Sequence, residues 1–196
     1  MKSVLARRRC TIVNILFRIL LTFNATSLLV IVFFVQQKFT LGYFLQFYPH
    51  VSFLRDWYPF ISYFLYLMIP VLLTALSIFL SRGLSSDDFK EGDVVSIEHA
   101  NNSFLPSYLG YFFVALSISS WSALFFVYGI LFIFTFLSQA LYFNPLFLVF
   151  RYEFYNIQTK GGASIFLISK HKYKAPKQIV ISKAFRINDY TFIERD

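Results

Sequence analysis

The stretch Tyr108–Phe150, YLGYFFVALSISSWSALFFVYGILFIFTFLSQALYFNPLFLVF, contains 43 residues and no Lys, Arg, Asp, Glu or His. One continuous helix of that length would extend about 64 Å, roughly twice the hydrocarbon thickness of a bilayer. The polar residues near its middle, Ser117, Ser119, Ser120 and Ser122 around Trp121, predict a tight turn. The stretch therefore predicts two membrane spans, over about 105–118 and 123–143, with one long tilted helix as the alternative.

Two earlier apolar runs, over about 12–35 and 59–80, each have the length of a transmembrane helix. Gln36-Gln37-Lys38 ends the first run and Ser81-Arg82-Gly83 ends the second. Pro70 predicts a bend in the second helix, because proline removes a backbone donor. The aromatic segment between the runs, Phe39 to Tyr58, is expected to be a loop in the headgroup region.

The composition excludes a soluble globular protein. Hydrophobic residues make up 57% of the chain and charged residues 14%, against roughly a quarter charged in ordinary globular domains. We therefore expect an α-helical membrane protein, a four-helix transmembrane bundle with a small cytoplasmic β-rich C-terminal domain.

The basic residues predict the orientation. The tail 151–196 contains nine Lys and Arg, within a chain of net charge +8, and such residues are retained on the cytoplasmic side. Four spans keep the basic N-terminus 1–11, the acidic connection 82–104 and this tail on that side. Three spans would export the tail.

The tail is expected to form a small sheet that docks on the acidic connection. Lys160-Gly161-Gly162 is a strong hairpin signal, and Asn188-Asp189 is a second turn signal. The expected strands are 152–159, 163–169, 179–185 and 190–193, with a further strand over 93–99 in the connection.

Charged residues of the connection and tail are candidates for binding a partner. The run Lys170–Lys174 interleaves basic and aromatic residues, which suits phosphates or an acidic protein surface. Beneath a bilayer, lipid headgroups and protein are favoured, and no direct nucleic-acid binding is expected. The partner-binding candidates are Asp87, Asp88, Glu91, Asp93, Glu98, Lys170, Lys172, Lys174 and Lys177.

Polar residues form stripes along the expected helices. Such stripes indicate packing between helices or copies of the chain, and lining of a small channel or permease is the alternative. The candidates for this face are Tyr63, Tyr66, Thr74, Ser77, Tyr128, Thr135, Gln139 and Tyr142. Arg7, Arg8, Arg9 and Arg18 are expected at the membrane interface, with Arg18 extending to the headgroups.

No catalytic or metal-binding pattern is present in the sequence. His50, His99 and His171 lie in separate segments, and Glu98-His99 is an acid-base pair that a short polar loop produces by chance. Cys10 is the only cysteine, so no intrachain disulfide can form. We expect a protein that is not an enzyme, with no catalytic residue, metal or cofactor.

Two stretches carry a family resemblance. They are IEHANNSFLPSYLGY at Ile97–Tyr111, and the region from Asn144-Pro145-Leu146 through RYEFY at 151–155 to IFLIS at Ile165–Ser169. Together with the helix count they resemble KwaA, the membrane subunit of the bacterial Kiwa anti-phage system. The resemblance implies a four-span inner-membrane protein that forms homo-oligomers, detects phage attack and works with KwaB, a cytoplasmic DNA-binding partner. The expected function is thus a non-enzymatic sensor and scaffold that recruits or regulates this effector.

Overall fold

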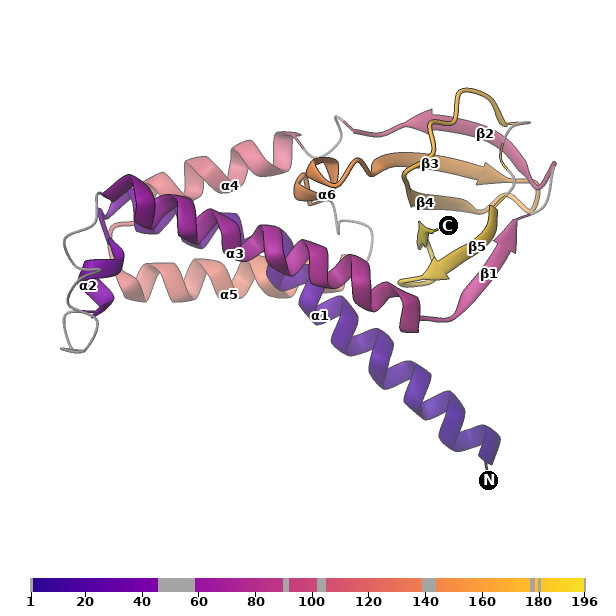
Figure 1. The fold of residues 1–196 in the computed structure, drawn as a ribbon, viewed down its shortest axis with the longest axis horizontal. Helices are drawn as coiled ribbons and strands as arrows, with labels where there is room; N and C mark the ends of the chain where they lie inside the picture. The colour runs from indigo at the N-terminus through magenta and orange to yellow at the C-terminus, as the bar shows by residue number, and fades with distance from the viewer. Residues whose placement is uncertain are drawn as a thin grey trace.

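The computed structural model describes residues 2–45, 59–89, 92–101, 105–138, 144–176, 179 and 181–195, with the side chains of 2–12, 45, 107 and 182 excepted. Helices occupy one part of the molecule and a β-sheet the other (Figure 1). The end of the helical part that adjoins the sheet is called the sheet end below, and the opposite end is called the distal end.

One helix is central to the helical part. This helix, α1, packs against α3, α4 and α5, and the four helices alternate in direction between the two ends (Figure 1). The helices are α1 (Lys2–Gln36), α2 (Leu41–Leu45), α3 (Pro59–Leu80), α4 (Leu105–Ser117), α5 (Trp121–Leu137) and α6 (Leu146–Val149), and a single 3-10 turn, η2 (Ser81–Gly83), follows α3. The basic segment 1–11, expected to be separate from the first span, is largely the first part of α1.

The long uncharged stretch breaks into the two helices α4 and α5, as the sequence predicted, and the short helix α6 follows them. Ser120 ends the break between α4 and α5, and its hydroxyl accepts a hydrogen bond from the Ala123 amide (3.3 Å). Gln36 and Gln37, at the end of α1, donate to the carbonyls of Leu116 (2.7 Å) and Ile118 (3.3 Å). These bonds satisfy carbonyls at the end of α4 that have no partner within the helix.

Two helices of the described residues have the length and composition of membrane spans. They cover Val13–Gln36 and Pro59–Gly83. The other two are apolar but have only 13 and 17 residues, about 20 and 26 Å, against roughly 30 Å of hydrocarbon. A bundle of four full-length spans is therefore not confirmed. Residues 139–143, expected to complete the last span, lie outside the described residues.

Six strands form one sheet in the order β1-β5-β6-β4-β3-β2. Adjacent strands are antiparallel except for the parallel pair β4 and β6. The strands are β1 (Ser86–Phe89), β2 (Val94–His99), β3 (Glu153–Thr159), β4 (Ser164–Ser169), β5 (Ile181–Arg186) and β6 (Thr191–Glu194). The five predicted strands are present within two residues at each end, and the hairpin of β3 and β4 turns at Gly162, whose φ of 80° favours glycine.

The acidic connection belongs to the sheet itself. β1 pairs with β5 at one edge, and β2 pairs with β3 at the other edge. The contact expected between the tail and the connection is thus strand pairing within a single sheet. The prediction of a sheet confined to the tail was wrong in this respect, because the sequence of β1, SDDF, lacks the β-branched residues that mark a strand.

The sheet has two buried faces. Side chains at alternate positions, such as Tyr155, Ile157 and Leu167, form a core within the sheet domain. Phe154 and Ile168, on the opposite face, join a second core that includes residues of α1, α3 and α6. The sheet is therefore packed directly on the helices at the sheet end.

We predict that Phe154→Ala destabilises the protein by about 3–5 kcal/mol, because it leaves a cavity between sheet and helices. Phe154 is fully buried in this second core. Thermal unfolding of the detergent-solubilised protein measures the effect. Asn156→Ala, at an exposed position of the same strand, is the control, and equal losses in the two variants would contradict the packing described.

Candidate functional site

A cluster of polar side chains joins three helical segments inside the apolar part of the molecule. The hydroxyl of Thr74 in α3 lies 2.7 Å from the side-chain amide group of Asn24 in α1 and 3.1 Å from the amide nitrogen of Asn144. All three side chains are buried. Asn144 also accepts from the Leu146 amide (3.0 Å) and so begins α6. Buried amides and hydroxyls need such partners, since water is excluded.

The same cluster includes the backbone of α3 at its proline. The Thr74 hydroxyl lies 2.7 Å from the carbonyl of Pro70. In the amide orientation that satisfies both of its polar atoms, Asn24 donates to that carbonyl (3.1 Å) and accepts from the Thr74 amide (3.2 Å). Asn24 thereby bridges backbone groups of α3 next to the position where a helix-interior proline weakens the helix.

Polar side chains also join α5 to α1 and to α4. Thr26 of α1 donates to the Tyr128 hydroxyl of α5 (3.2 Å), and the hydroxyls of Tyr111 and Thr135 lie 3.3 Å apart. Arg18 of α1 donates to the Phe136 carbonyl (3.2 Å), with its guanidinium 5.0 Å from the Phe136 ring centre. The positive charge of Arg18 also lies near the C-terminal end of α5, where it interacts favourably with the helix dipole.

Six of the eight predicted polar stripe residues lie in the described part of the chain. Tyr66, Thr74, Ser77 and Thr135 are buried, and Tyr63 and Tyr128 are half-buried, whereas Gln139 and Tyr142 lie outside the described residues. A role of these stripe residues in contacts between copies of the chain stays a prediction. Arg18 contacts α5, a partner that the sequence analysis did not anticipate. The side chains of Arg7, Arg8 and Arg9 lie outside the described part of α1.

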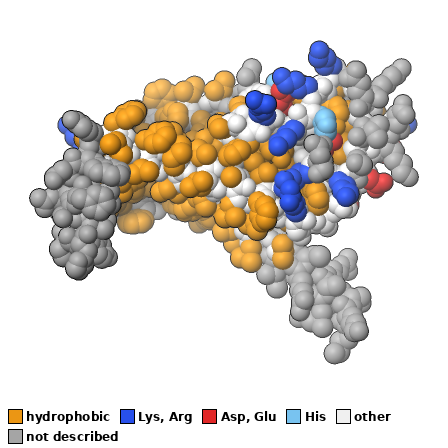
Figure 2. Space-filling model, in the orientation of Figure 1, with side chains coloured by type: hydrophobic (Ala, Val, Ile, Leu, Met, Phe, Trp, Pro, Cys, Tyr) orange, Lys and Arg blue, Asp and Glu red, His pale blue; other side chains and the backbone are white. Residues whose placement is uncertain are grey.

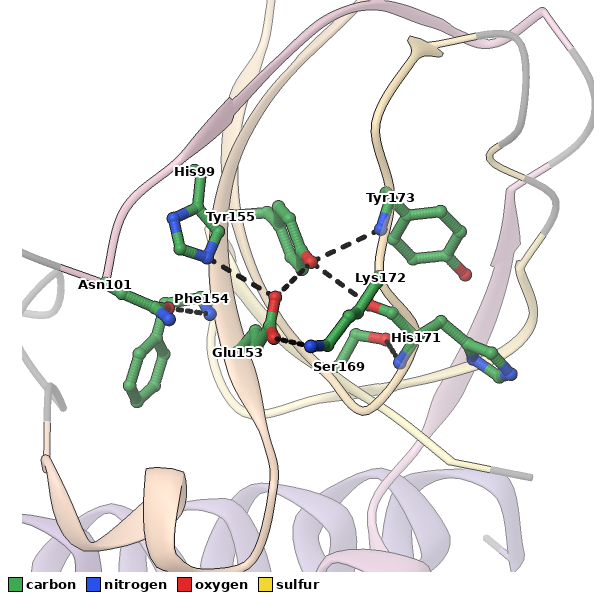
Figure 3. A network of polar contacts seen from close by, with 9 residues as sticks. All are labelled: His99, Asn101, Glu153, Phe154, Tyr155, Ser169, His171, Lys172 and Tyr173. Carbon is green, nitrogen blue, oxygen red and sulfur yellow. Dashed lines mark hydrogen bonds and ion pairs between the residues drawn. The ribbon is translucent and has the colours of Figure 1, made fainter.

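A second polar cluster lies at the sheet, around the carboxylate of Glu153 (Figure 3). One of its oxygens accepts from the Tyr155 hydroxyl (2.8 Å) and lies 3.3 Å from His99. The other oxygen lies 3.5 Å from the Lys172 ammonium. Tyr155 is also 3.1 Å from the His171 carbonyl. Glu153 and Tyr155 therefore hold the basic segment after β4 against the sheet.

Glu194 of β6 contacts the same segment. Its buried carboxylate accepts from the hydroxyls of Ser169 and Tyr173, the latter at 2.7 and 2.9 Å, and lies 3.5 Å from His171. The two carboxylates thus hold three consecutive residues, His171, Lys172 and Tyr173. Their chemistry resembles a structural clamp, since each acidic group is already engaged by its own chain.

The pKa values of this clamp follow from burial and neighbouring charge. Burial raises the pKa of Glu153, but the hydrogen bond from Tyr155 and the charges of Lys172 and His99 outweigh it, so the net pKa lies below the ordinary 4.5. Burial and the hydrogen bond to Glu153 raise the pKa of Tyr155 to about 12. Burial and Glu194 likewise raise the pKa of Tyr173. At neutral pH the carboxylate of Glu153 is charged and both phenols keep their protons.

The predicted partner-binding residues separate into engaged and exposed groups. Asp87 forms an ion pair with Arg186 (2.9 Å), which links β1 to β5, and Lys172 is near Glu153. Asp93 is half-buried at the start of β2. Asp88, Glu98, Lys170 and Lys174 are exposed. Glu91 and Lys177 lie outside the described residues.

The sheet and the helices are also joined by one long-range hydrogen bond. Arg195, after β6, donates through its guanidinium to the carbonyl of Ile78 at the end of α3. Ile78 is itself buried in the core shared by sheet and helices. A displacement of the end of α3 would therefore act on the last strand of the sheet.

The sequence analysis missed Asn24, Asn144, Glu153, Glu194 and Arg195 as important residues. Asn24 had a usable signal, since an amide inside a long apolar helix, a candidate membrane span, needs a partner in another helix. The other four lie at element ends, where only the fold reveals their neighbours.

The family model described as "Anti-phage protein KwaA" matches residues 17–193, which is most of the chain. The match includes all of the residues named in the two clusters except Glu194. Searches of the curated proteins and of the solved structures gave no significant match.

We predict that Thr74→Val destabilises the protein by about 1–3 kcal/mol, because two buried amides lose a partner. Thermal unfolding in detergent measures this. Ser77→Ala is the matched control: Ser77 is equally buried in α3, but its hydroxyl bonds only to the Leu73 carbonyl of its own helix. A loss no larger than that of the control would show that the cluster does not hold the helices together.

We predict that Glu153→Gln reduces the loss of stability in acid. A lowered carboxyl pKa contributes stability that is present above the unfolded pKa and is lost as pH falls through the folded value. Melting temperatures between about pH 5 and pH 3 should therefore fall more steeply in the wild type than in Glu153→Gln. Glu98→Gln, on the adjacent strand and exposed, should leave the wild-type slope. Equal slopes in all three proteins would contradict the clamp.

Proposed function

We propose that this chain, which belongs to the KwaA family of anti-phage proteins, is a non-enzymatic membrane sensor and scaffold. In this proposal the helices respond to a disturbance of the bacterial inner membrane. The sheet passes the response to a cytoplasmic effector, a KwaB-like DNA-binding protein.

The distribution of side chains supports the membrane arrangement in this proposal. Apolar side chains cover the helical part, and Lys and Arg gather over the sheet end (Figure 2). On α4 and α5, Phe113, Phe125 and Phe126 are 68%, 69% and 70% exposed, which suits lipid or another copy of the chain. In the proposed arrangement all four helices lie in the bilayer, with the N-terminus and the sheet on the cytoplasmic side.

The observation that carries the proposal is the direct connection of sheet and helices. α3 leads into β1 through η2, and α6 is followed within three residues by β3. The bond from Arg195 to the Ile78 carbonyl adds a link that closes over the end of α3. A shift of α3 in the membrane would therefore displace β1, which follows α3 in the chain, and β6, which Arg195 links to α3.

A sensor also needs two states of similar free energy. Pro70 gives α3 a place to bend, and the Asn24 and Thr74 side chains lie against that place. A hinge formed in this way would move the sheet end of α3 relative to α1. Such small shifts in packed helices are a common form of switching.

The partner would bind the exposed charges of the sheet domain. Lys170 and Lys174 are exposed and flank residues 171–173, which the two carboxylates hold in place, so their positions are preorganised for an acidic partner surface. The channel alternative requires Thr74 to line a pore. Its hydroxyl is instead fully buried and bonded between helices, which supports packing.

We predict that Arg195→Ala abolishes protection against phage while the protein stays in the membrane and still copurifies with its cytoplasmic effector. The substitution removes the link to Ile78 but leaves the exposed charges of the sheet unchanged. Plating efficiency of phage measures protection, and affinity copurification measures the complex. Lys183→Ala, with an exposed side chain on β5, is the control and should keep both activities. Full protection by Arg195→Ala would overturn the proposed coupling.

A further inference from the structure

The helical part contains an apolar groove. Of the residues in the proposed coupling, only Pro70 lines it. α3 and α5 both pack on α1, and the groove runs over α1 between them. Its volume is about 320 Å³, which is at the lower end of the range for ligand-binding pockets. Apolar cavities of this kind exclude water.

The length of the groove corresponds to one leaflet of a bilayer. Along α1 it extends from Phe23 to Phe34, about 16 Å at 1.5 Å per residue. One leaflet contributes about 15 Å of hydrocarbon. Phe34 is near the distal end of α1, so the groove spans the depth of the leaflet farther from the sheet.

The groove opens through an apolar rim. Ile69 of α3 and Phe125 of α5 line it and are 55% and 69% exposed. The exposed lining of the groove is entirely apolar. It therefore offers no polar partner to a headgroup or a peptide backbone and suits a hydrocarbon chain.

The aromatic residues at the distal end suit the headgroup side of such a chain. Trp121 begins α5 and lines the groove, and tryptophan prefers the membrane interface. Tyr66, 5.6 Å from Phe34 between ring centres, lies at the same end. Its hydroxyl is buried away from the groove, so Tyr66 presents only its ring to a bound chain.

We propose that this groove binds one acyl chain of a phospholipid from the leaflet distal to the sheet. The inference rests on the membrane location in the proposed function and adds a ligand to it. The chain lies against Pro70, whose carbonyl belongs to the cluster of Asn24 and Thr74. Occupancy of the groove therefore acts on α3 at its proline, and lipid packing becomes an input to the sheet.

Fluorescence of Trp121 tests the site in the full-length protein. The chain has two tryptophans, so Trp57→Phe leaves Trp121 as the only indole. The purified variant is placed in vesicles of phosphatidylglycerol and phosphatidylethanolamine, in which phospholipids with dibrominated acyl chains replace a rising fraction. Bromine quenches tryptophan on contact. We expect quenching to saturate at a low fraction of brominated lipid.

Filling the groove should weaken this binding selectively. Val30→Phe adds bulk inside the groove, and we expect it to raise the fraction for half-quenching about fourfold, the factor that corresponds to one lost methylene contact. Ile69→Phe at the exposed rim is a second variant, should Val30→Phe fail to fold. Leu72→Phe, 66% exposed on α3 and outside the groove, is the matched control and should not change quenching.

Two results would overturn the inference. Quenching that rises in proportion to brominated lipid, equally in all variants, would mean ordinary contact with surrounding lipid. Absent quenching, with cross-linking of copies through Ile69→Cys in a Cys10→Ser background, would mean that another copy covers the groove. If either result is found while Arg195→Ala abolishes protection, the lipid site is wrong and the proposed function stands. If quenching saturates but Arg195→Ala protects fully, the proposed function is wrong and the lipid site stands.

Discussion

The hydrogen bonds among Asn24, Thr74 and Asn144 are the constraint on which the helical arrangement depends. In an apolar environment each of these groups costs free energy unless another helix supplies its partner. Dispersion forces alone allow helices to slide and rotate, since lipid is as apolar as leucine. The polar cluster permits one register of α1 against α3 and fixes where α6 begins. Its contribution is therefore geometric specificity as much as stability.

That register determines how the sheet is assembled. The edge strands β1 and β2 come from the connection between α3 and α4, whereas the inner strands come from the tail. They can pair only if the end of α3 and the start of β3 lie at the same end of the bundle, and Asn144 and Thr74 bring these segments together. The ion pair of Asp87 with Arg186 then acts within the sheet, where the sequence suggested a charge free to bind a partner.

The sequence predicted those parts of the fold that local patterns determine. Hydrophobic length located α1 and α3, the serine cluster around Trp121 located the break between α4 and α5 to within two residues, and Gly161-Gly162 located the hairpin of β3 and β4. Three features were beyond such patterns. Strand β1 has a polar sequence that forms a strand only because β5 lies beside it. The clamp of Glu153 and Glu194 and the bond from Arg195 to Ile78 join residues distant in sequence, so they depend on the tertiary structure.

Pro70 belongs both to the polar cluster of Asn24 and Thr74 and to the lining of the apolar groove. Its carbonyl lies against the polar groups of Thr74 and Asn24, while its side of α3 lines the apolar groove. A chain in the groove favours the separation of α3 from α5 that the groove requires, and the polar cluster favours close contact of α3 with α1. Both effects act on α3 at the level of Pro70. A helix bends most readily at an interior proline, so a change in either effect would alter the direction in which the last turns of α3 reach the sheet.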